Sequence, residues 1–145
     1  MTKPAKSPKQ NISLQIKGQT VPNAYDDQNI FAKILRGEIP NDTVLETAHT
    51  LAFNDIQPQA PVHVLVIPKG AYATFDDFAA NASDAEIADF TRTAGEVCRL
   101  KGVHTGDGGN GYRGITNAGQ DGLQDVPHYH MHILGGRDLG CILRD

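Results

Sequence analysis

Apolar residues recur at helical spacing in two parts of the chain. In residues 29–37 (NIFAKILRG), Asn29 stands where a helix cap is favoured, apolar residues follow three and four positions apart, and a glycine ends the pattern. In residues 83–102, Ser83 and Glu86 have the spacing of a capping box, and apolar residues again follow at helical spacing up to a glycine. The pattern predicts one short helix near the N-terminal side of the chain and one long central helix.

Five other segments are typical of strands. Residues 43–47 and 50–54 are rich in β-branched and apolar residues and lie close enough together to form a hairpin. Residues 63–68 (HVLVIP) form a nearly continuous apolar run that ends at a proline, as in a strand covered on both faces. Two later strands are expected at 112–117 and 128–134. The order of the elements predicts an α+β fold, with two helices packed on a five-stranded, mainly antiparallel sheet.

The composition fits one domain. The chain has 145 residues, of which 39% are hydrophobic and 21% are charged, as in an ordinary globular protein. Residues 1–25 are rich in Lys, Pro, Gln and Asn and show little periodicity, which indicates a flexible N-terminal arm before a domain that spans residues 26–145. The two cysteines, Cys98 and Cys141, form no metal-type pair and are expected to be reduced thiols.

Charge and hydropathy exclude several classes of partner. The formal net charge is -4, so we expect no extended basic surface for nucleic acid, whereas backbone amides or histidines can still hold a small nucleotide. No stretch approaches the roughly 18 apolar residues that are needed to span a bilayer. The basic N-terminus has no apolar segment behind it that would make a secretory signal. We therefore expect a cytoplasmic protein with no membrane partner.

Three of the six histidines stand at alternate positions near the C-terminal side of the chain: His128, His130 and His132. Because side chains on a strand alternate between faces, all three imidazoles are expected on one face of the strand. The residues expected on the other face, toward the core, are Tyr129, Met131 and Ile133. A row of imidazoles opposite an apolar face is typical of a functional site and not of a core.

Two kinds of chemistry suit this row. Neutral imidazole is a common zinc ligand, and two of the three histidines could bind an ion together with His63. At about 3.3 Å per residue, however, the outer two α-carbons lie roughly 13 Å apart, so the three cannot all hold one ion. The alternative is phosphate chemistry, in which one imidazole attacks phosphorus while its neighbours place protons and stabilise the oxyanions. A linear row favours the second interpretation, because it suits a ligand that lies along the strand.

Four blocks of the chain match, in order, those of a known family. HYHMHIL (128–134) has alternating histidines followed by apolar residues, and LGGR (134–137) follows directly. IFAKILRGEIP (30–40) and NDIQPQAPVHVLVIPK (54–69) precede them. These blocks resemble the histidine triad superfamily, and within it the bacterial members of the branch called histidine triad nucleotide-binding (Hint) proteins. The resemblance covers about residues 29–140 and implies a HIT-like fold.

The resemblance implies a purine nucleotide-binding hydrolase. Members of the branch bind a purine nucleoside monophosphate and cleave a bond to its α-phosphorus, typically in nucleoside phosphoramidates and aminoacyl adenylates. His130 matches the nucleophile, which forms a nucleotidyl-histidine intermediate that water hydrolyses to release AMP or GMP. His128 matches the residue that orients this nucleophile, and His132 matches the one on the phosphate and leaving-group side. His63 matches the fourth histidine of the site.

The resemblance also implies where the nucleotide lies. Asp55 matches the acidic residue that binds the ribose hydroxyls. The residues that match the slot around the base are Ile30, Phe31, Ile34, Phe53, Asn54 and Ile56. Asn117 and Gln124 match side chains that reach the phosphate. No metal or cofactor is implied, and the branch forms a homodimer through the long helix and strand 112–117, which joins two sheets into one.

One nucleotide-site residue departs from the pattern of the branch. Asp125 stands where Hint proteins usually carry a serine, whose hydroxyl can donate a proton toward the leaving nitrogen. An ionised carboxylate only accepts, and it adds negative charge beside an anionic phosphate. Leu123 and Pro127 also replace the usual Gly and Tyr, and the chain lacks the longer aromatic tail of animal members. The change at Asp125 leaves room for a second hypothesis, a nucleotide-binding regulatory or scaffold protein with only residual hydrolysis.

Overall fold

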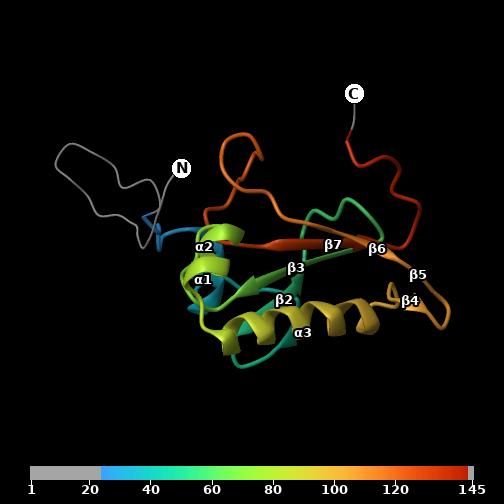
Figure 1. Cartoon of the computed structure of the whole chain (residues 1–145), viewed down its shortest axis with the longest axis horizontal. Helices are drawn as coiled ribbons and strands as arrows, with labels where there is room; N and C mark the ends of the chain where they lie inside the picture. The colour runs from blue at the N-terminus through green and yellow to red at the C-terminus, as the bar shows by residue number, and fades with distance from the viewer. Residues whose placement is uncertain (1–23, 144–145) are drawn as a thin grey trace.

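The computed structural model describes residues 24–143, so most of the predicted N-terminal arm lies outside the described residues. Its centre is a five-stranded sheet in the order β1-β2-β3-β7-β6, in which every neighbouring pair is antiparallel (Figure 1). The strands are β1 (Thr43–Glu46), β2 (Thr50–Asn54), β3 (Val62–Pro68), β6 (Tyr112–Ile115) and β7 (Met131–Gly135). The predicted α+β fold is confirmed, and each of the five predicted strands has a counterpart.

Two of the helices are the predicted ones, and both begin at the predicted caps. The Asn29 side chain accepts a hydrogen bond from the Ala32 amide, and Ser83 and Glu86 form the reciprocal bonds of a capping box. The helices of the fold are α1 (Ile30–Leu35), α2 (Phe75–Asn81) and α3 (Asp84–Leu100). Within residues 24–143, no helix is long and apolar enough to cross a membrane.

The helix α2 was not predicted, so the expectation of two helices was wrong. Its seven residues are too few to show a helical repeat in the sequence. Local contacts stabilise it, because the Thr74 side chain accepts a hydrogen bond from the Asp77 amide and Phe78 is buried. The glycine-rich connector after α3 also contains a small hairpin, made of β4 (Thr105–Gly106) and β5 (Gly109–Asn110).

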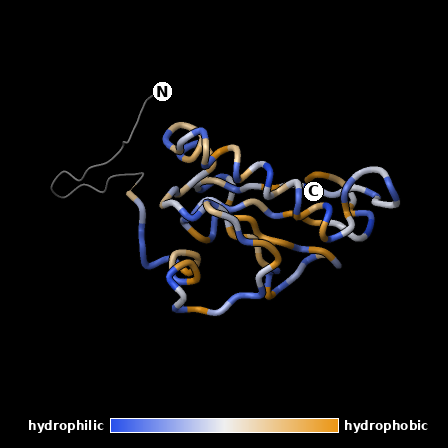
Figure 2. The backbone as a smooth tube through the Cα atoms, turned by 90° about the horizontal axis from the view of Figure 1, so that it is seen from below, coloured by the Kyte–Doolittle hydropathy of each residue, from blue (hydrophilic) through white to orange (hydrophobic). Residues whose placement is uncertain are grey.

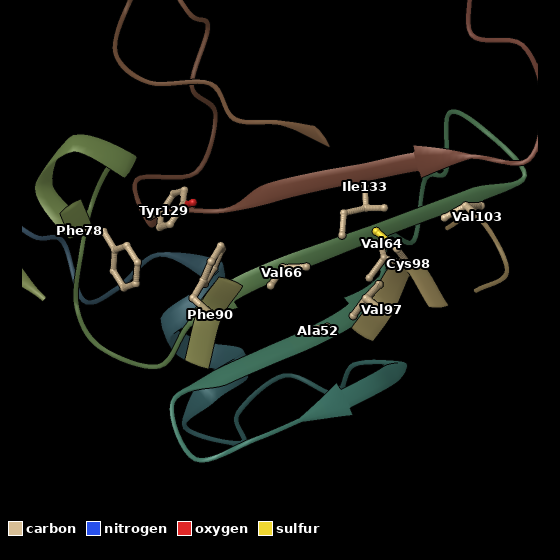
Figure 3. Packing of buried hydrophobic residues seen from close by; sticks show 10 residues of the cluster. All are labelled: Ala52, Val64, Val66, Phe78, Phe90, Val97, Cys98, Val103, Tyr129 and Ile133. Carbon is tan, nitrogen blue, oxygen red and sulfur yellow. The ribbon is translucent and has the colours of Figure 1, made fainter. Parts of the chain in front are cut away.

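Strand β3 is covered on both faces, as its continuous apolar run predicts. Val64 and Val66 belong to a larger core cluster between α3 and the sheet, drawn in Figure 3. Leu65 and Ile67 point the other way and pack in a smaller cluster that includes Phe31 of α1. Figure 2 shows hydrophobic residues, coloured orange, interspersed with hydrophilic ones, coloured blue, along the chain. Because α1 has only six residues, it spans about 9 Å and covers only part of its face of the sheet.

The histidine strand is shorter than predicted. Strand β7 begins at Met131, whereas the sequence predicted a strand from His128 onward. In the register with β3, residue 129 would face Pro68, which ends β3 and has no N–H to donate. The carbonyl oxygen of Pro68 accepts a hydrogen bond from the His128 ring and not from the backbone of a neighbouring strand. The segment before β7, which contains His128 and His130, is therefore not paired with β3 as a strand.

The predicted division of side chains between two faces is nevertheless confirmed. Tyr129 and Ile133 are buried in the larger cluster between α3 and the sheet. The rings of His128 and His130 lie on the opposite side, edge-on to Phe31. Both imidazoles are almost completely buried, whereas His132 on the same face is partly exposed.

Candidate active site

A cavity of about 340 Å³ lies between α1, the end of β2 and the histidine segment. This volume falls within the roughly 300–1,000 Å³ of small-molecule sites. Most of the predicted site residues line it, namely Ile30, Phe31, Ile34, Phe53, Asn54, Asp55, Ile56, Asp125, His130 and His132. The cavity thus has an apolar part beside α1 and β2 and a polar part formed by carboxylates and imidazoles.

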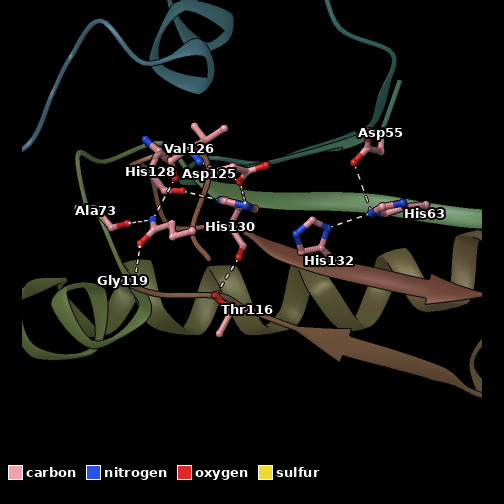
Figure 4. A network of polar contacts seen from close by, with 11 residues as sticks. Asp55, His63, Ala73, Thr116, Gly119, Asp125, Val126, His128, His130 and His132 are labelled. Carbon is pink, nitrogen blue, oxygen red and sulfur yellow. Dashed lines mark hydrogen bonds and ion pairs between the residues drawn. The ribbon is translucent and has the colours of Figure 1, made fainter. Parts of the chain in front are cut away.

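His130 presents one ring nitrogen to this cavity. Its Nδ1 lies 2.7 Å from the carbonyl oxygen of His128 (Figure 4), and because a carbonyl oxygen only accepts, Nδ1 carries the proton. Neutral His130 therefore has its lone pair on Nε2. The Phe31 ring stands edge-on to the imidazole, with 5.0 Å between the ring centroids. An imidazole that is anchored at one nitrogen and unprotonated at the other is a nucleophile of defined orientation.

His128 supports His130 from behind. Its Nε2 donates to the Pro68 carbonyl oxygen at 2.8 Å, and its Nδ1 accepts from the Tyr25 hydroxyl. The backbone carbonyl of His128 is the group that holds His130. His128 itself has no exposed surface and does not line the cavity. Its contacts are those of a support for the neighbouring ring.

His63 and His132 form a second pair, at the other end of the polar wall. The amide of Gln59 donates to Nδ1 of His63 at 3.0 Å, so His63 carries its proton on Nε2. Nε2 of His63 donates this proton to Nδ1 of His132, and the two nitrogens are 2.9 Å apart. Oδ2 of Asp55 lies 3.4 Å from Nε2 of His63. His132 consequently accepts on Nδ1 and keeps its own proton on Nε2. The pair turns His132 into a hydrogen-bond donor, whereas His130 is an acceptor.

Burial keeps the neighbours of His130 neutral. The pKa of both His128 and His132 is lowered from 6.5 to about 4, mainly by desolvation and to a smaller extent by charge on His130. Desolvation also lowers the pKa of His63, although the Asp55 carboxylate opposes the effect. The contact of His63 with Asp55 is therefore an N–H···O contact at neutral pH and not an ion pair.

The same contacts test whether the site suits a metal. Asp55, His63 and His132 each offer one ligand atom, and these atoms lie within 4.8 Å of one another. A metal at Nε2 of His63 requires a lone pair there, with the proton on Nδ1 donated to an acceptor. Here Nδ1 of His63 instead accepts from the Gln59 amide, which places the proton on the would-be ligand atom. The donor set does not fit a metal in this arrangement.

Asp125 lies at the entrance to the histidine face. Its Oδ1 is 3.7 Å from Nε2 of His130, and its side chain is 82% exposed. The same oxygen accepts a hydrogen bond from the Val126 amide at 2.8 Å. A carboxylate and an unprotonated nitrogen are both acceptors, so they do not bond each other unless a proton lies between them. Asp125 therefore places negative charge beside the free nitrogen of His130.

Comparison with known proteins identifies the family of this chain. Residues 36–139, more than half of the chain, match the HIT domain. The chain belongs to the HIT family. It is 57% identical to a 13.2 kDa HIT-like protein of Azospirillum brasilense, over 82% of this chain and 94% of that protein. It is 40% identical to a purine nucleoside phosphoramidase of Escherichia coli, over 81% of this chain and 94% of that enzyme.

The fold agrees with solved structures of the family. A HIT family hydrolase from Clostridium thermocellum superposes with a TM-score of 0.71 at 39% identity, covering 81% of this chain and 98% of that one. The resemblance that four blocks of sequence indicate is therefore confirmed for the family and for the fold.

Four predicted site residues of the HIT protein lie outside the lining of the cavity, namely His63, His128, Asn117 and Gln124. Both N–H groups of the Gln124 amide donate within the protein, to the carbonyl oxygens of Ala73 and Val126, and its oxygen accepts from Gly119. Gln124 thereby ties the loop before the histidines to the chain before α2. Asn117 follows strand β6. A phosphate contact by Asn117 or Gln124 stays a prediction.

Several residues of the site were not predicted. The additional residues that line the cavity are Ile39, Pro40, Asn41, Asp42, Gln57, Leu65 and Val126. Thr116 donates to the backbone carbonyl of His130 at 2.9 Å. Tyr25, assigned by its composition to the arm, contacts His128. In the sequence, the position of Tyr25 four residues before the helix cap Asn29 was the only feature that could have indicated this contact.

Proposed function

We propose that this HIT protein is a purine nucleotide-binding hydrolase. It cleaves at the α-phosphorus of nucleoside 5'-phosphoramidates or adenylates through a nucleotidyl-His130 intermediate, and releases AMP or GMP. The observation that carries the proposal is the orientation of His130, whose Nδ1–H is held by the His128 carbonyl while Nε2 is unprotonated. The phosphoramidase name of the relative from Escherichia coli supports the substrate class.

The lining of the cavity favours one orientation of the nucleotide. The purine base lies in the apolar part, where Phe31 and Phe53 stand edge-on to each other. The ribose hydroxyls donate to the Asp55 carboxylate, a charge-assisted hydrogen bond. The α-phosphorus then lies at His130, and the leaving group points toward the exposed Asp125.

In the first step, the lone pair on Nε2 of His130 attacks the α-phosphorus. The bond from phosphorus to the leaving nitrogen or oxygen breaks, and the leaving group takes the electron pair and a proton from solvent water. The His128 carbonyl accepts from Nδ1–H and stabilises the positive charge that the ring acquires. His132, which has its proton on Nε2, donates to a phosphoryl oxygen.

In the second step, water attacks the phosphorus of the nucleotidyl-histidine. The bond from phosphorus to Nε2 breaks, and its electron pair returns to the ring of His130. The attacking water loses a proton to solvent, and its oxygen becomes a phosphate oxygen of the released nucleotide. The ring regains its unprotonated Nε2 because Nδ1–H is held by His128 throughout.

Turnover of a fluorogenic adenosine 5'-phosphoramidate tests the proposal. We expect the parent protein to release AMP, and the His130→Ala variant to lose at least about 1,000-fold in kcat/KM because it lacks the nucleophile. A panel that includes aminoacyl adenylates and guanosine analogues defines the substrate class. Turnover by His130→Ala equal to that of the parent protein would refute the role of His130.

One observation favours a second candidate function. The Asp125 carboxylate places negative charge 3.7 Å from the nucleophilic nitrogen, where it opposes the approach of an anionic phosphate. The HIT protein could then be a nucleotide-binding regulatory or scaffold protein with residual hydrolysis. Micromolar affinity for AMP, together with negligible turnover of every substrate in the panel, would favour this alternative.

We also propose that the protein forms a homodimer. Strand β6 lies at one end of the sheet order, so one of its edges is available to a second copy. Its Tyr112 is half exposed, and Leu100 at the end of α3 is similarly exposed. Sedimentation equilibrium tests the proposal: we expect twice the mass of one chain, and a monomer at all concentrations would contradict it.

A further inference from the structure

The side chain of Tyr25 lies against His128, a residue 103 positions later in the sequence. Its hydroxyl oxygen is 2.5 Å from Nδ1 of His128, and the two rings are T-shaped, with centroids 5.6 Å apart. The same hydroxyl accepts from Nδ2 of Asn29 at 3.0 Å, while Oδ1 of Asn29 caps helix α1. Tyr25 therefore links the start of α1 to the histidine segment.

The direction of each hydrogen bond in this link is determined. Nε2 of His128 faces the Pro68 carbonyl oxygen, which only accepts, so the proton is on Nε2 and Nδ1 is an acceptor. The Tyr25 hydroxyl must therefore donate its proton to Nδ1, and its oxygen at the same time accepts from Asn29. Both ring nitrogens of a completely buried imidazole are satisfied, one of them by Tyr25.

We propose that Tyr25 is a positioning residue for the nucleophile His130. The inference rests on the proposed function of His130. The Tyr25 hydroxyl holds the ring of His128 in one tautomer and orientation, and residue 128 in turn supplies the carbonyl that holds Nδ1–H of His130. Tyr25 touches neither the cavity nor the reacting atoms, so it acts only through His128.

Loss of the hydroxyl leaves the buried Nδ1 of His128 without its donor. The ring then keeps an unpaired acceptor, or it moves its proton to Nδ1 and loses the bond to Pro68. Either change shifts residue 128, whose carbonyl sets the angle at which His130 faces phosphorus. A misdirected nucleophile slows the reaction more than it weakens binding, because the base and ribose contacts are made elsewhere. We therefore expect an effect on kcat and not on KM.

The Tyr25→Phe variant tests this expectation, with Tyr72→Phe as a matched control. Tyr72 is also partly buried, and its hydroxyl bonds Glu86, away from the histidines. We expect Tyr25→Phe to lower kcat for the adenosine phosphoramidate at least tenfold with KM within twofold of the parent value. Tyr72→Phe should stay within twofold in both constants. An unchanged kcat in Tyr25→Phe, or an equal loss in both variants, would overturn the proposal.

A second measurement does not depend on turnover. Nitrogen-15 NMR of histidine-labelled protein at neutral pH reports which ring nitrogen of His128 carries the proton. We expect Nε2 alone in the parent protein, and a changed tautomer or altered shifts in Tyr25→Phe. A proton on Nδ1 of His128 in the parent, or an identical His128 spectrum in the variant, would overturn the proposal without any variant having to be active.

The two measurements separate the failure of this inference from that of the proposed function. A parent protein that hydrolyses no phosphoramidate or adenylate contradicts the proposed function, and the NMR spectra then still decide whether Tyr25 holds His128. An active parent whose Tyr25→Phe variant is equally active contradicts only the positioning role.

Discussion

His63 and His132, 69 positions apart in the sequence, share a hydrogen bond of 2.9 Å between Nε2 and Nδ1. This bond gives His132 the opposite tautomer to His130, although their rings are neighbours with centroids 5.2 Å apart. One ring thus keeps a lone pair on Nε2, and the other keeps a proton there. In the proposed mechanism the first attacks phosphorus while the second bonds one of its oxygens.

The tautomer of His130 predicts the atom that carries the covalent intermediate. Protein that is mixed briefly with an adenylate and quenched in an alkaline denaturant, which preserves the phosphorus–nitrogen bond, should contain an adenylyl group on the peptide that includes His130. The link should be to Nε2, because Nδ1 is bonded to the His128 carbonyl. Mass spectrometry locates the peptide and phosphorus NMR distinguishes the two nitrogens. An adduct on His128 or His132, or a link to Nδ1, would contradict the assignment.

Asp55 is expected to recognise the ribose hydroxyls. We predict that Asp55→Asn lowers kcat/KM for the ribonucleoside substrate about tenfold or more, since a hydrogen bond to a charged group is worth about 1.5–3 kcal/mol. The 2'-deoxy substrate provides the control. The parent protein should discriminate against it, and Asp55→Asn should discriminate much less. Equal discrimination by both proteins would show that the carboxylate does not contact the 2'-hydroxyl.

Asp125 is expected to limit phosphoramidate turnover. Asp125→Ser removes the charge 3.7 Å from Nε2 of His130 and supplies a hydroxyl that can donate toward the leaving nitrogen. We predict a rise of roughly two- to tenfold in kcat for the adenosine phosphoramidate, equivalent to at most about 1.4 kcal/mol. Asp121→Ser, an exposed acidic position in the same loop, serves as the control. No change or a loss in Asp125→Ser would mean that the carboxylate already serves the leaving group.

Buried His128 makes stability depend on pH. Its pKa is lowered to about 4 in the folded protein, so between about 4 and 6.5 the unfolded chain binds a proton that the folded chain does not. The free energy of unfolding should therefore fall as pH decreases from 6.5 toward 4, by up to about 3 kcal/mol from this ring. Urea unfolding at pH 7 and pH 4.5 measures the change. His128→Gln should show a smaller loss, and a midpoint that is equal at both pH values in the parent would contradict the prediction.

Removal of metal should leave turnover unchanged. The Gln59 amide places a proton on the nitrogen of His63 that would have to bind an ion. We predict that protein dialysed exhaustively against a chelator, and verified as metal-free by elemental analysis, hydrolyses the phosphoramidate at the parent rate. Activity that is lost on chelation and restored by zinc would show that the arrangement of Asp55, His63 and His132 changes to bind an ion.

Much of the fold was predictable because its signals are local. Asn29 and Ser83 mark helix starts through bonds to residues three positions away. The two-residue alternation around His130 identifies the buried and the site-facing side chains without knowledge of their partners. The helix α2 was not predicted because its seven residues are too few to show the 3.6-residue periodicity of a helix. The late start of β7 was not predicted because it depends on Pro68 in another strand.

The sequence by itself determined which side chains share the histidine face and, through its matching blocks, the family to which they belong. Only the tertiary structure decided what each imidazole does there. A neutral histidine can carry its proton on either ring nitrogen, and for His128 and His132 no neighbouring residue in the sequence selects between them. The choice is made by Tyr25 and Pro68 for His128, and by His63 for His132, partners 60 to 103 positions away that packing brings within hydrogen-bond distance.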